Sequence, residues 1–191
     1  MHVEEKTIEY DGSQLSPLWA YSSFGVAGDS IVSFRGPCEV LREHMVDIED
    51  LRNRSTISSP DMLHFIVERF GATLKEMVLT QRLLLAVVTE LLRGAADEGI
   101  RLERAFDNVY AAAPGDSCWG KLSVSVASVS LVSGMMHLGL NVTGAGAPVR
   151  AVGLHDLGIE DIDGFAEKVE EAFLGEIENV EADACKVRPL S

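Results

Sequence analysis

The stretch "GKLSVSVASVSLVSGMMHLGLNV", residues 120–142, decides the fold because two alternating runs of polar and apolar residues flank the turn sequence "VSG". Alternation with a period of two is typical of half-buried β-strands. In the first run Lys121, Ser123 and Ser125 fall on one face, and leucine and valine side chains fall on the other. The stretch therefore predicts a hairpin whose first strand opens with a lysine.

The return run places His137 and Asn141 on its polar face, with Gly139 between them. A glycine within a strand often marks a place where a ligand or another backbone approaches closely. The alternation changes phase after Ala127 and Ser128, which predicts a bulge. Because the register is not fixed by the sequence, the polar face is either an ordinary solvated surface or one site-like surface. The members of that site-like surface are Lys121, Ser123, Ser125, His137 and Asn141.

Two helices and several strands are predicted around this hairpin. Apolar residues recur at helical spacing over 73–97, and a second apolar stripe predicts a helix over 160–173. Alternating or β-branched runs predict strands over 62–70, 100–104 and 107–113. The remaining tail is ambiguous between continued helix and extended chain.

The N-terminal third is expected to be largely extended. Aromatic and β-branched residues predict strands over 18–24 and 30–34, followed by a short helix over 36–45 and a charged loop over 46–61. We therefore expect an α+β fold in which a mostly antiparallel sheet is flanked by helices. No linker-like change in composition divides the chain, so 1–191 is expected to form a single domain.

Composition narrows the classes of partner and compartment. The formal net charge is −14, which disfavours a polyanionic nucleic acid or an anionic membrane surface as a partner. No run of about 20 apolar residues predicts a membrane span, and the acidic start does not resemble a secretory signal. Three widely spaced cysteines suit a reducing compartment. We expect a cytoplasmic protein.

Several segments resemble an archaeal family known only as domain of unknown function 366. They include "WAYSSFGVAGDSIVSFRGPCEV", "MVDIEDLR", "DNVY", "GKLSVSVASVS" and "HLGLNV", so the likeness spans nearly the whole chain. A more distant similarity is to the catalytic domains of biotin protein ligases, lipoate ligases and octanoyltransferases, which are class II synthetase-like. The resemblance implies that fold.

In that superfamily, an Asn-Asp-hydrophobic strand precedes a strand that opens with a lysine and a strand that ends Gly-hydrophobic-Asn-Val. Here Asp107 and Asn108, then Lys121, then "GLNV" containing Asn141, follow in the same order. The superfamily's lysine contacts the acyl group or its adenylate, which implies Lys121 as the catalytic residue. A fixed ammonium would stabilise negative charge that develops on oxygen. The resemblance and the neighbouring polar residues give these substrate-binding candidates: Arg52, Arg54, Asn108, Ser123 and Asn141.

The sequence also departs from the superfamily's pattern. "STISSPD" at 55–61 replaces the glycine-rich loop of lipoate ligases, and the biotin ligases' Gly-Arg-rich loop has no counterpart, so ATP as a cofactor is doubtful. Octanoyltransferases carry a nucleophilic cysteine where this chain has Ala151, Val152 and Gly153. Val124 stands where biotin ligases have glycine, which predicts a different pocket floor.

No metal site is predicted. His44, His64, His137 and His155 show no ligand spacing, and each is expected to be a surface or internally hydrogen-bonded residue. The mixed-charge run after Asp47 could hold a cation or an anion, but a solvated loop is the commoner outcome. Cys118 lies close to Lys121, which could activate its thiol, although burial as a small hydrophobic residue is the expected role.

Two functions stay open at this point. The first is binding or transfer of a small carboxylate or acyl ligand, such as lipoate, octanoate or biotin, in a cleft around Lys121. The second is a non-catalytic ligand-binding or homo-oligomeric protein that keeps the ligase-like fold without its activating loops. The order of the lysine and asparagine residues favours the first. The missing loops and the missing cysteine favour the second, so whether the protein is an acyltransferase, a ligase or no enzyme is undecided.

Overall fold

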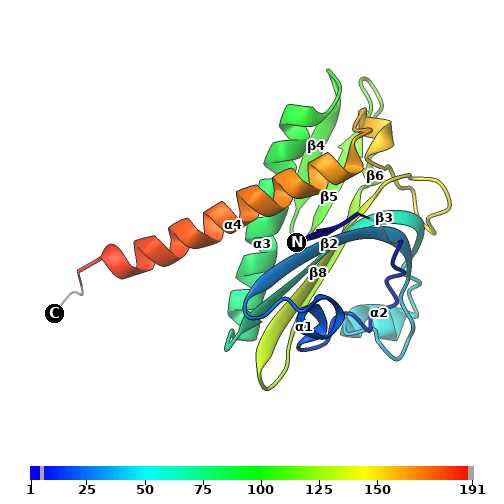
Figure 1. The fold of residues 1–191 in the computed structure, drawn as a ribbon. Helices are drawn as coiled ribbons and strands as arrows, with labels where there is room; N and C mark the ends of the chain where they lie inside the picture. The colour runs from blue at the N-terminus through cyan, green and yellow to red at the C-terminus, as the bar shows by residue number, and fades with distance from the viewer. Residues whose placement is uncertain (5–6, 189–191) are drawn as a thin grey trace.

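A five-stranded sheet in the order β1-β2-β3-β8-β7 forms the centre of the computed structural model, which describes residues 1–4 and 7–188 (Figure 1). Every neighbouring pair is antiparallel except β1 with β2. This arrangement confirms the predicted α+β fold with a mostly antiparallel sheet. The strands are β1 (His2–Val3), β2 (Ser30–Glu39), β3 (Ser58–Phe70), β7 (Ser123–Val129) and β8 (Ser133–Asn141).

A second, three-stranded antiparallel sheet joins the first through Leu122. It consists of β4 (Arg101–Ala105), β5 (Asn108–Ala112) and β6 (Gly120–Lys121). The Leu122 side chain is fully buried, and its backbone N–H donates to the Val109 carbonyl at 2.8 Å. The predicted first strand is thus divided between two sheets, with Lys121 in the smaller sheet and Ser123 in the larger.

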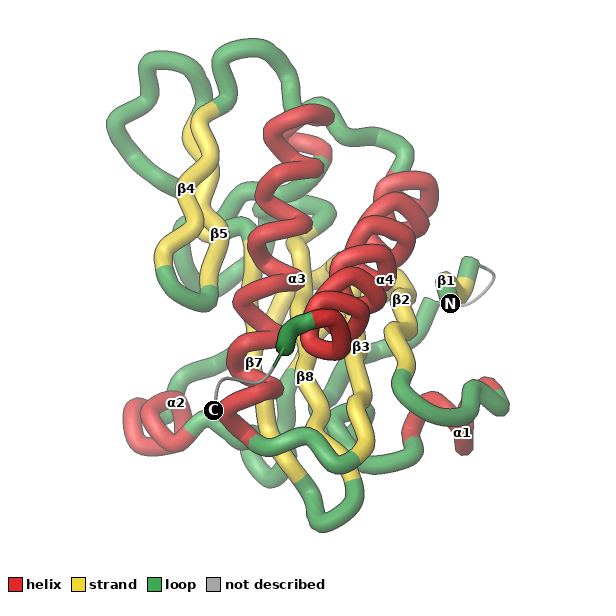
Figure 2. The backbone as a smooth tube through the Cα atoms, turned by 90° about the vertical axis from the view of Figure 1, so that its left-hand side faces the viewer, coloured by secondary structure: helices red, strands yellow, loops and turns green. Residues whose placement is uncertain are grey.

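Two long helices cover one face of the five-stranded sheet (Figure 2). The first, α3 (Leu74–Ala95), confirms the predicted 73–97 helix, and a capping box between Thr73 and Glu76 starts it. The second, α4 (Ile162–Lys186), runs well past the predicted end at residue 173, and its last turns project from the body (Figure 1). No helix in the described part of the chain is long and apolar enough to cross a bilayer.

The opposite face of the sheet carries a smaller aromatic and sulfur-containing cluster. Its buried members are Tyr10, Phe34, Cys38, Met62 and Ile66. The helices α1 (Trp19–Phe24) and α2 (Ile48–Asn53) belong to the connections on this side. The candidate site lies on this second face.

The prediction was wrong at three places in the N-terminal third. Residues 19–24 form α1 instead of a strand, and α2 forms inside the predicted loop, where the Asp47 side chain caps it. Residues 36–39 extend β2 instead of starting a helix. The register shifts between Gly36 and Cys38, so the intervening proline sits at a bulge, where a strand tolerates it.

The predicted hairpin is present, but its predicted bulge is not. Residues from Ser123 to Val129 pair with β8 without a register shift, so alternate side chains keep the same face along the whole strand. Ser123 lies opposite Leu140, and Val126 lies opposite His137. This continuous register decides which residues reach the site.

Candidate functional site

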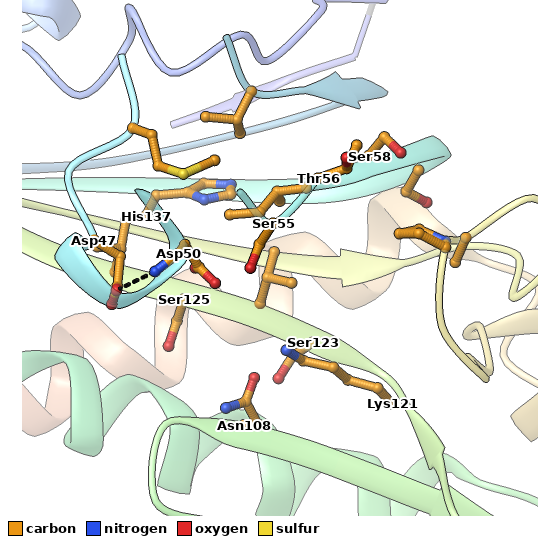
Figure 3. A pocket seen from close by; sticks show the side chains of 18 of the residues that line it. Asp47, Asp50, Ser55, Thr56, Ser58, Asn108, Lys121, Ser123, Ser125 and His137 are labelled. Carbon is orange, nitrogen blue, oxygen red and sulfur yellow. Dashed lines mark hydrogen bonds between the residues drawn. The ribbon is translucent and has the colours of Figure 1, made fainter. Parts of the chain in front are cut away.

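A cavity of about 460 Å³ lies against the second face of the five-stranded sheet (Figure 3). Its floor includes side chains from β3, β7, β8 and the segment before α1. Its walls come from α2 with the preceding loop, from residues 55–59 and from residues 147–151. The floor residues used below are Tyr10, Met62, Val124, Val126 and His137.

Lys121 enters this cavity from a fixed backbone. Its N–H donates to the Arg150 carbonyl at 3.0 Å, and its own carbonyl accepts from the Val152 N–H at 3.1 Å. Gly120 permits this approach, because a Cβ there would lie 2.5 Å from a Val152 methyl group. In Figure 3 the Lys121 side chain extends toward Asn108 and Ser123.

Asn141 holds the same junction together. Its side-chain Nδ2 donates to the Lys121 carbonyl at 3.1 Å and to the Val152 carbonyl at 3.3 Å. The residue is 7% exposed and borders the cavity. Asn141 therefore fixes the backbone that carries Lys121, and its side-chain N–H groups are already hydrogen-bonded within the protein.

Ser123 and Ser125 do not share a face of the sheet with His137, so the predicted common face was wrong, although all five residues of the predicted polar surface border the cavity. In the observed register these serines lie opposite leucines that pack toward α3, whereas His137 lies on the other side. The Ser123 hydroxyl accepts from the Val109 N–H at 2.7 Å, and the Ser125 hydroxyl donates to the Asp107 carbonyl at 2.7 Å. Both serines border the cavity, and their hydroxyls tie β7 to β5 and to the residue that precedes it.

The other predicted binding residues divide into one that lines the cavity and two that do not. Asn108 lines it beside Lys121, with its Nδ2 donating to the Asp107 carboxylate at 2.8 Å. Arg52 lies in the last turn of α2 and Arg54 caps that helix, and the described residues that line the cavity include neither. The same helix instead contributes acidic residues, among them Asp50.

Two buried histidines form a site feature that the sequence interpretation missed. His64 Nδ1 lies 3.0 Å from His137 Nε2, and His64 Nε2 lies 3.1 Å from the Gly36 carbonyl. Tyr10 stacks on the His137 ring with centroids 3.7 Å apart. The available signal was that both histidines interrupt apolar runs in strands that later prove to be neighbours.

Burial sets the protonation of this pair. Desolvation lowers the pKa of His64 to about 4 and lowers the pKa of His137 well below its ordinary value, and the His64 ring adds to the cost of charging His137. Desolvation likewise raises the pKa of the neighbouring Tyr10 hydroxyl. All three side chains are therefore neutral near pH 7.

Gly139 makes room for this pair instead of for a ligand. A Cβ at Gly139 would lie 2.8 Å from the Met62 methyl group and 3.2 Å from the His137 ring. The strand glycine thus marks a close approach, as expected, but the approaching group is an internal side chain.

In the described part of the chain, the cysteines and acidic residues bring neither a thiol to the cavity nor three converging metal ligands. Cys118 is exposed, which corrects the expectation of burial, and desolvation raises the pKa of the buried Cys38 thiol to about 12. Within residues 1–4 and 7–188, no three histidine, cysteine or acidic residues converge as metal ligands. The Asp47 carboxylate instead accepts from the Glu49 N–H at 2.8 Å as the α2 cap.

Comparison with solved structures confirms the ligase-like fold. A biotin protein ligase of Aquifex aeolicus, solved in complex with biotin, superposes with a TM-score of 0.57 at 14% identity, covering 94% of this chain and 70% of that one. A bipartite lipoate protein ligase of Thermoplasma acidophilum superposes with a TM-score of 0.55 at 14% identity, covering 90% and 82% of the two chains. At these identities the likeness concerns the fold alone.

Two archaeal relatives are much more similar. A protein of unknown function from Pyrococcus horikoshi has a TM-score of 0.91 at 43% identity, covering 100% of this chain and 98% of that one. An uncharacterised protein of Methanocaldococcus jannaschii is 38% identical over 189 residues, covering 96% of this chain and 81% of that protein. With a family model that matches residues 1–188, these relatives show that the chain belongs to the family described as domain of unknown function (DUF366).

Proposed function

We propose that the protein binds a small acyl carboxylate, with the carboxylate on Lys121 and the acyl chain along the cavity floor. The observation that carries the proposal is the placement of Lys121. Among the described residues that line the cavity, it is the single lysine or arginine, and no acidic side chain in the described chain forms a salt bridge with it. A carboxylate is the natural partner for an ammonium group held in this way.

The cavity floor suits an acyl chain. Val124 and Val126 extend along β7 from the Lys121 end, and Met45 and Met62 add flexible apolar surface. Burying apolar area contributes roughly 25 cal/mol per Å², so a chain of several methylenes would add to the binding free energy of the carboxylate. The two fold relatives described above are named as biotin and lipoate ligases, which is consistent with a ligand that has one carboxylate and a mostly apolar body.

Binding is better supported than a chemical step. The segment 55–61 replaces the glycine-rich loop and passes along the cavity wall into β3. The described residues lining the cavity include no cysteine, which gives a thioester route no nucleophile there. The proposal therefore covers carboxylate binding and assigns neither ATP use nor acyl transfer.

Calorimetric titration of octanoate, lipoate and biotin tests this proposal. Lys121→Met keeps the aliphatic stem and removes the charge, and Lys75→Met on the exposed surface of α3 is the matched control. A charge-assisted hydrogen bond contributes about 1.5–3 kcal/mol, so Lys121→Met should weaken binding roughly 10- to 150-fold. Absence of binding by all three acids, or equal affinities in both variants, would overturn the proposal.

A further inference from the structure

The fixed hydrogen bonds of the buried histidine pair determine what the cavity floor offers to a ligand. The Gly36 carbonyl can only accept, so the proton on His64 must lie on Nε2. A neutral His64 then has a lone pair on Nδ1, which requires His137 to donate from its Nε2. A neutral His137 is consequently left with a lone pair on its Nδ1.

That lone pair opens onto the cavity. His137 is 2% exposed and lines the cavity, yet no described residue makes a hydrogen bond to its Nδ1. In the described chain, the polar side-chain atoms that are fully buried and lack a hydrogen-bond partner are Ser30 Oγ and Arg82 Nη1. His137 Nδ1 is not among them, so this nitrogen is not fully buried. In Figure 3 the His137 ring and Lys121 lie at opposite sides of the drawn pocket.

Tyr10 and Gly139 hold the His137 ring in this orientation. The Tyr10 ring lies nearly parallel to it, at an interplanar angle of 15°. Gly139 leaves the space that the ring and the Met62 methyl group occupy. A ligand that covers His137 Nδ1 without donating a hydrogen bond to it binds more weakly, because the buried acceptor then loses its hydrogen bond to water.

We infer that His137 is a specificity-determining residue that selects a carboxylate ligand whose far end carries a hydrogen-bond donor. The inference rests on the proposed binding of a carboxylate at Lys121. It names a hydroxy- or amide-bearing acyl chain as the preferred class and makes a purely hydrocarbon tail the weaker ligand.

The spacing suits a medium-length chain. Lys121 precedes Val126 by five residues, which at about 3.3 Å per residue separates their Cα atoms by at most roughly 16 Å. Val126 is the cross-strand partner of His137, and the Lys121 side chain shortens the gap by reaching into the cavity. A ligand would thus meet the ammonium at one end and the imidazole at the other.

Titration of octanoate, 8-hydroxyoctanoate and 1-octanol into the full-length protein tests the inference. Wild-type protein should bind 8-hydroxyoctanoate about two- to tenfold more tightly than octanoate, from the gain of one neutral hydrogen bond. His137→Phe keeps the aromatic stack and removes the acceptor, so the ratio should fall to about one, whereas the exposed control His155→Phe should keep the preference. The ¹⁵N resonance of His137 Nδ1 in the wild-type protein should move on adding 8-hydroxyoctanoate and give a readout that needs no variant.

The outcomes separate the two claims. Equal affinity for the two acids in wild-type protein, or a preference that survives in His137→Phe, would overturn the role of His137. If neither acid binds but 1-octanol does, and His137→Phe abolishes that binding, the carboxylate proposal fails while the donor-selective floor stands. If 1-octanol and both acids leave the His137 resonance unmoved, the inference fails.

Discussion

The buried histidine pair makes the stability of the protein depend on pH between about 6.5 and 4. Desolvation lowers the pKa of His64 from 6.5 to about 4, against smaller opposing effects of the Gly36 carbonyl and Asp61; desolvation also lowers the pKa of His137 well below its ordinary value, and His64 adds to that lowering. The unfolded chain therefore binds protons that the folded protein excludes. Stability is fully present above the unfolded pKa and is lost as the pH falls toward the folded value.

The size of this loss follows from the shift. One pKa unit corresponds to about 1.4 kcal/mol, so excluding a proton from His64 alone costs about 3 kcal/mol of stability by pH 4. Between about pH 6.5 and pH 5 His64 removes roughly 1.5 kcal/mol, and His137, whose pKa is also lowered, adds to this loss. Carboxylates with ordinary pKa values contribute little in that interval, which makes it the useful window.

Urea unfolding at a series of pH values measures this dependence. The matched variant is the double substitution His64→Phe with His137→Phe, which retains aromatic packing against Tyr10 and Phe34. We expect the free energy of unfolding of the wild-type protein to fall by at least about 1.5 kcal/mol more than that of the variant across the window. A direct NMR titration of the two imidazoles in the folded wild-type protein is the control. Parallel pH profiles for the two proteins, or imidazoles that titrate near 6.5, would refute the reasoning.

Three substitutions test other parts of the structure by urea unfolding at neutral pH. Asn141→Ala removes two hydrogen bonds that fix the Lys121 backbone, so it should cost about 1–3 kcal/mol of stability and also weaken octanoate binding. Unchanged stability together with unchanged octanoate affinity would contradict the role of Asn141 in positioning Lys121. Gly139→Ala forces a methyl group against the His137 ring and should cost about 1–3 kcal/mol; unchanged stability would show that the ring is not tightly held. Thr73→Ala removes the α3 cap and should cost about 1 kcal/mol, while leaving octanoate affinity as it is.

The parts of the fold that follow from sequence are those in which local pattern and tertiary environment agree. The α3 helix has a cap, an apolar stripe and no competing pattern, and the 120–142 hairpin has two clear alternating runs. The strand prediction for residues 19–24 fails because their composition favours a strand, whereas Leu18 and Gly25 adopt left-handed conformations at the two ends of a short helix. At Gly36 the chain continues as a strand instead of starting a helix, because the backbone of Ile8 packs against it. This contact joins residues that are distant in sequence.

The candidate site could be predicted only in part, because it depends on which faces are brought together. Lys121 and Asn108, which were predicted to line one cleft, both border the cavity because they flank a local strand connection. Ser123 was assigned to the wrong face because the hairpin register, which places Ser123 opposite Leu140 without a bulge, is not fixed by the sequence. The contact of His64 with His137 joins β3 to β8 across 73 positions, so the sequence marks each histidine within an apolar run but does not show that the two rings meet.

A crystal structure of the protein with 8-bromooctanoate would show where both ends of the ligand bind, since the bromine atom can be located by its anomalous signal. We predict a carboxylate oxygen within hydrogen-bond distance of Lys121 Nζ and the bromine over the Val126 and His137 end of the cavity floor. A ligand bound outside the cavity, or one with its carboxylate turned away from Lys121, would contradict this prediction.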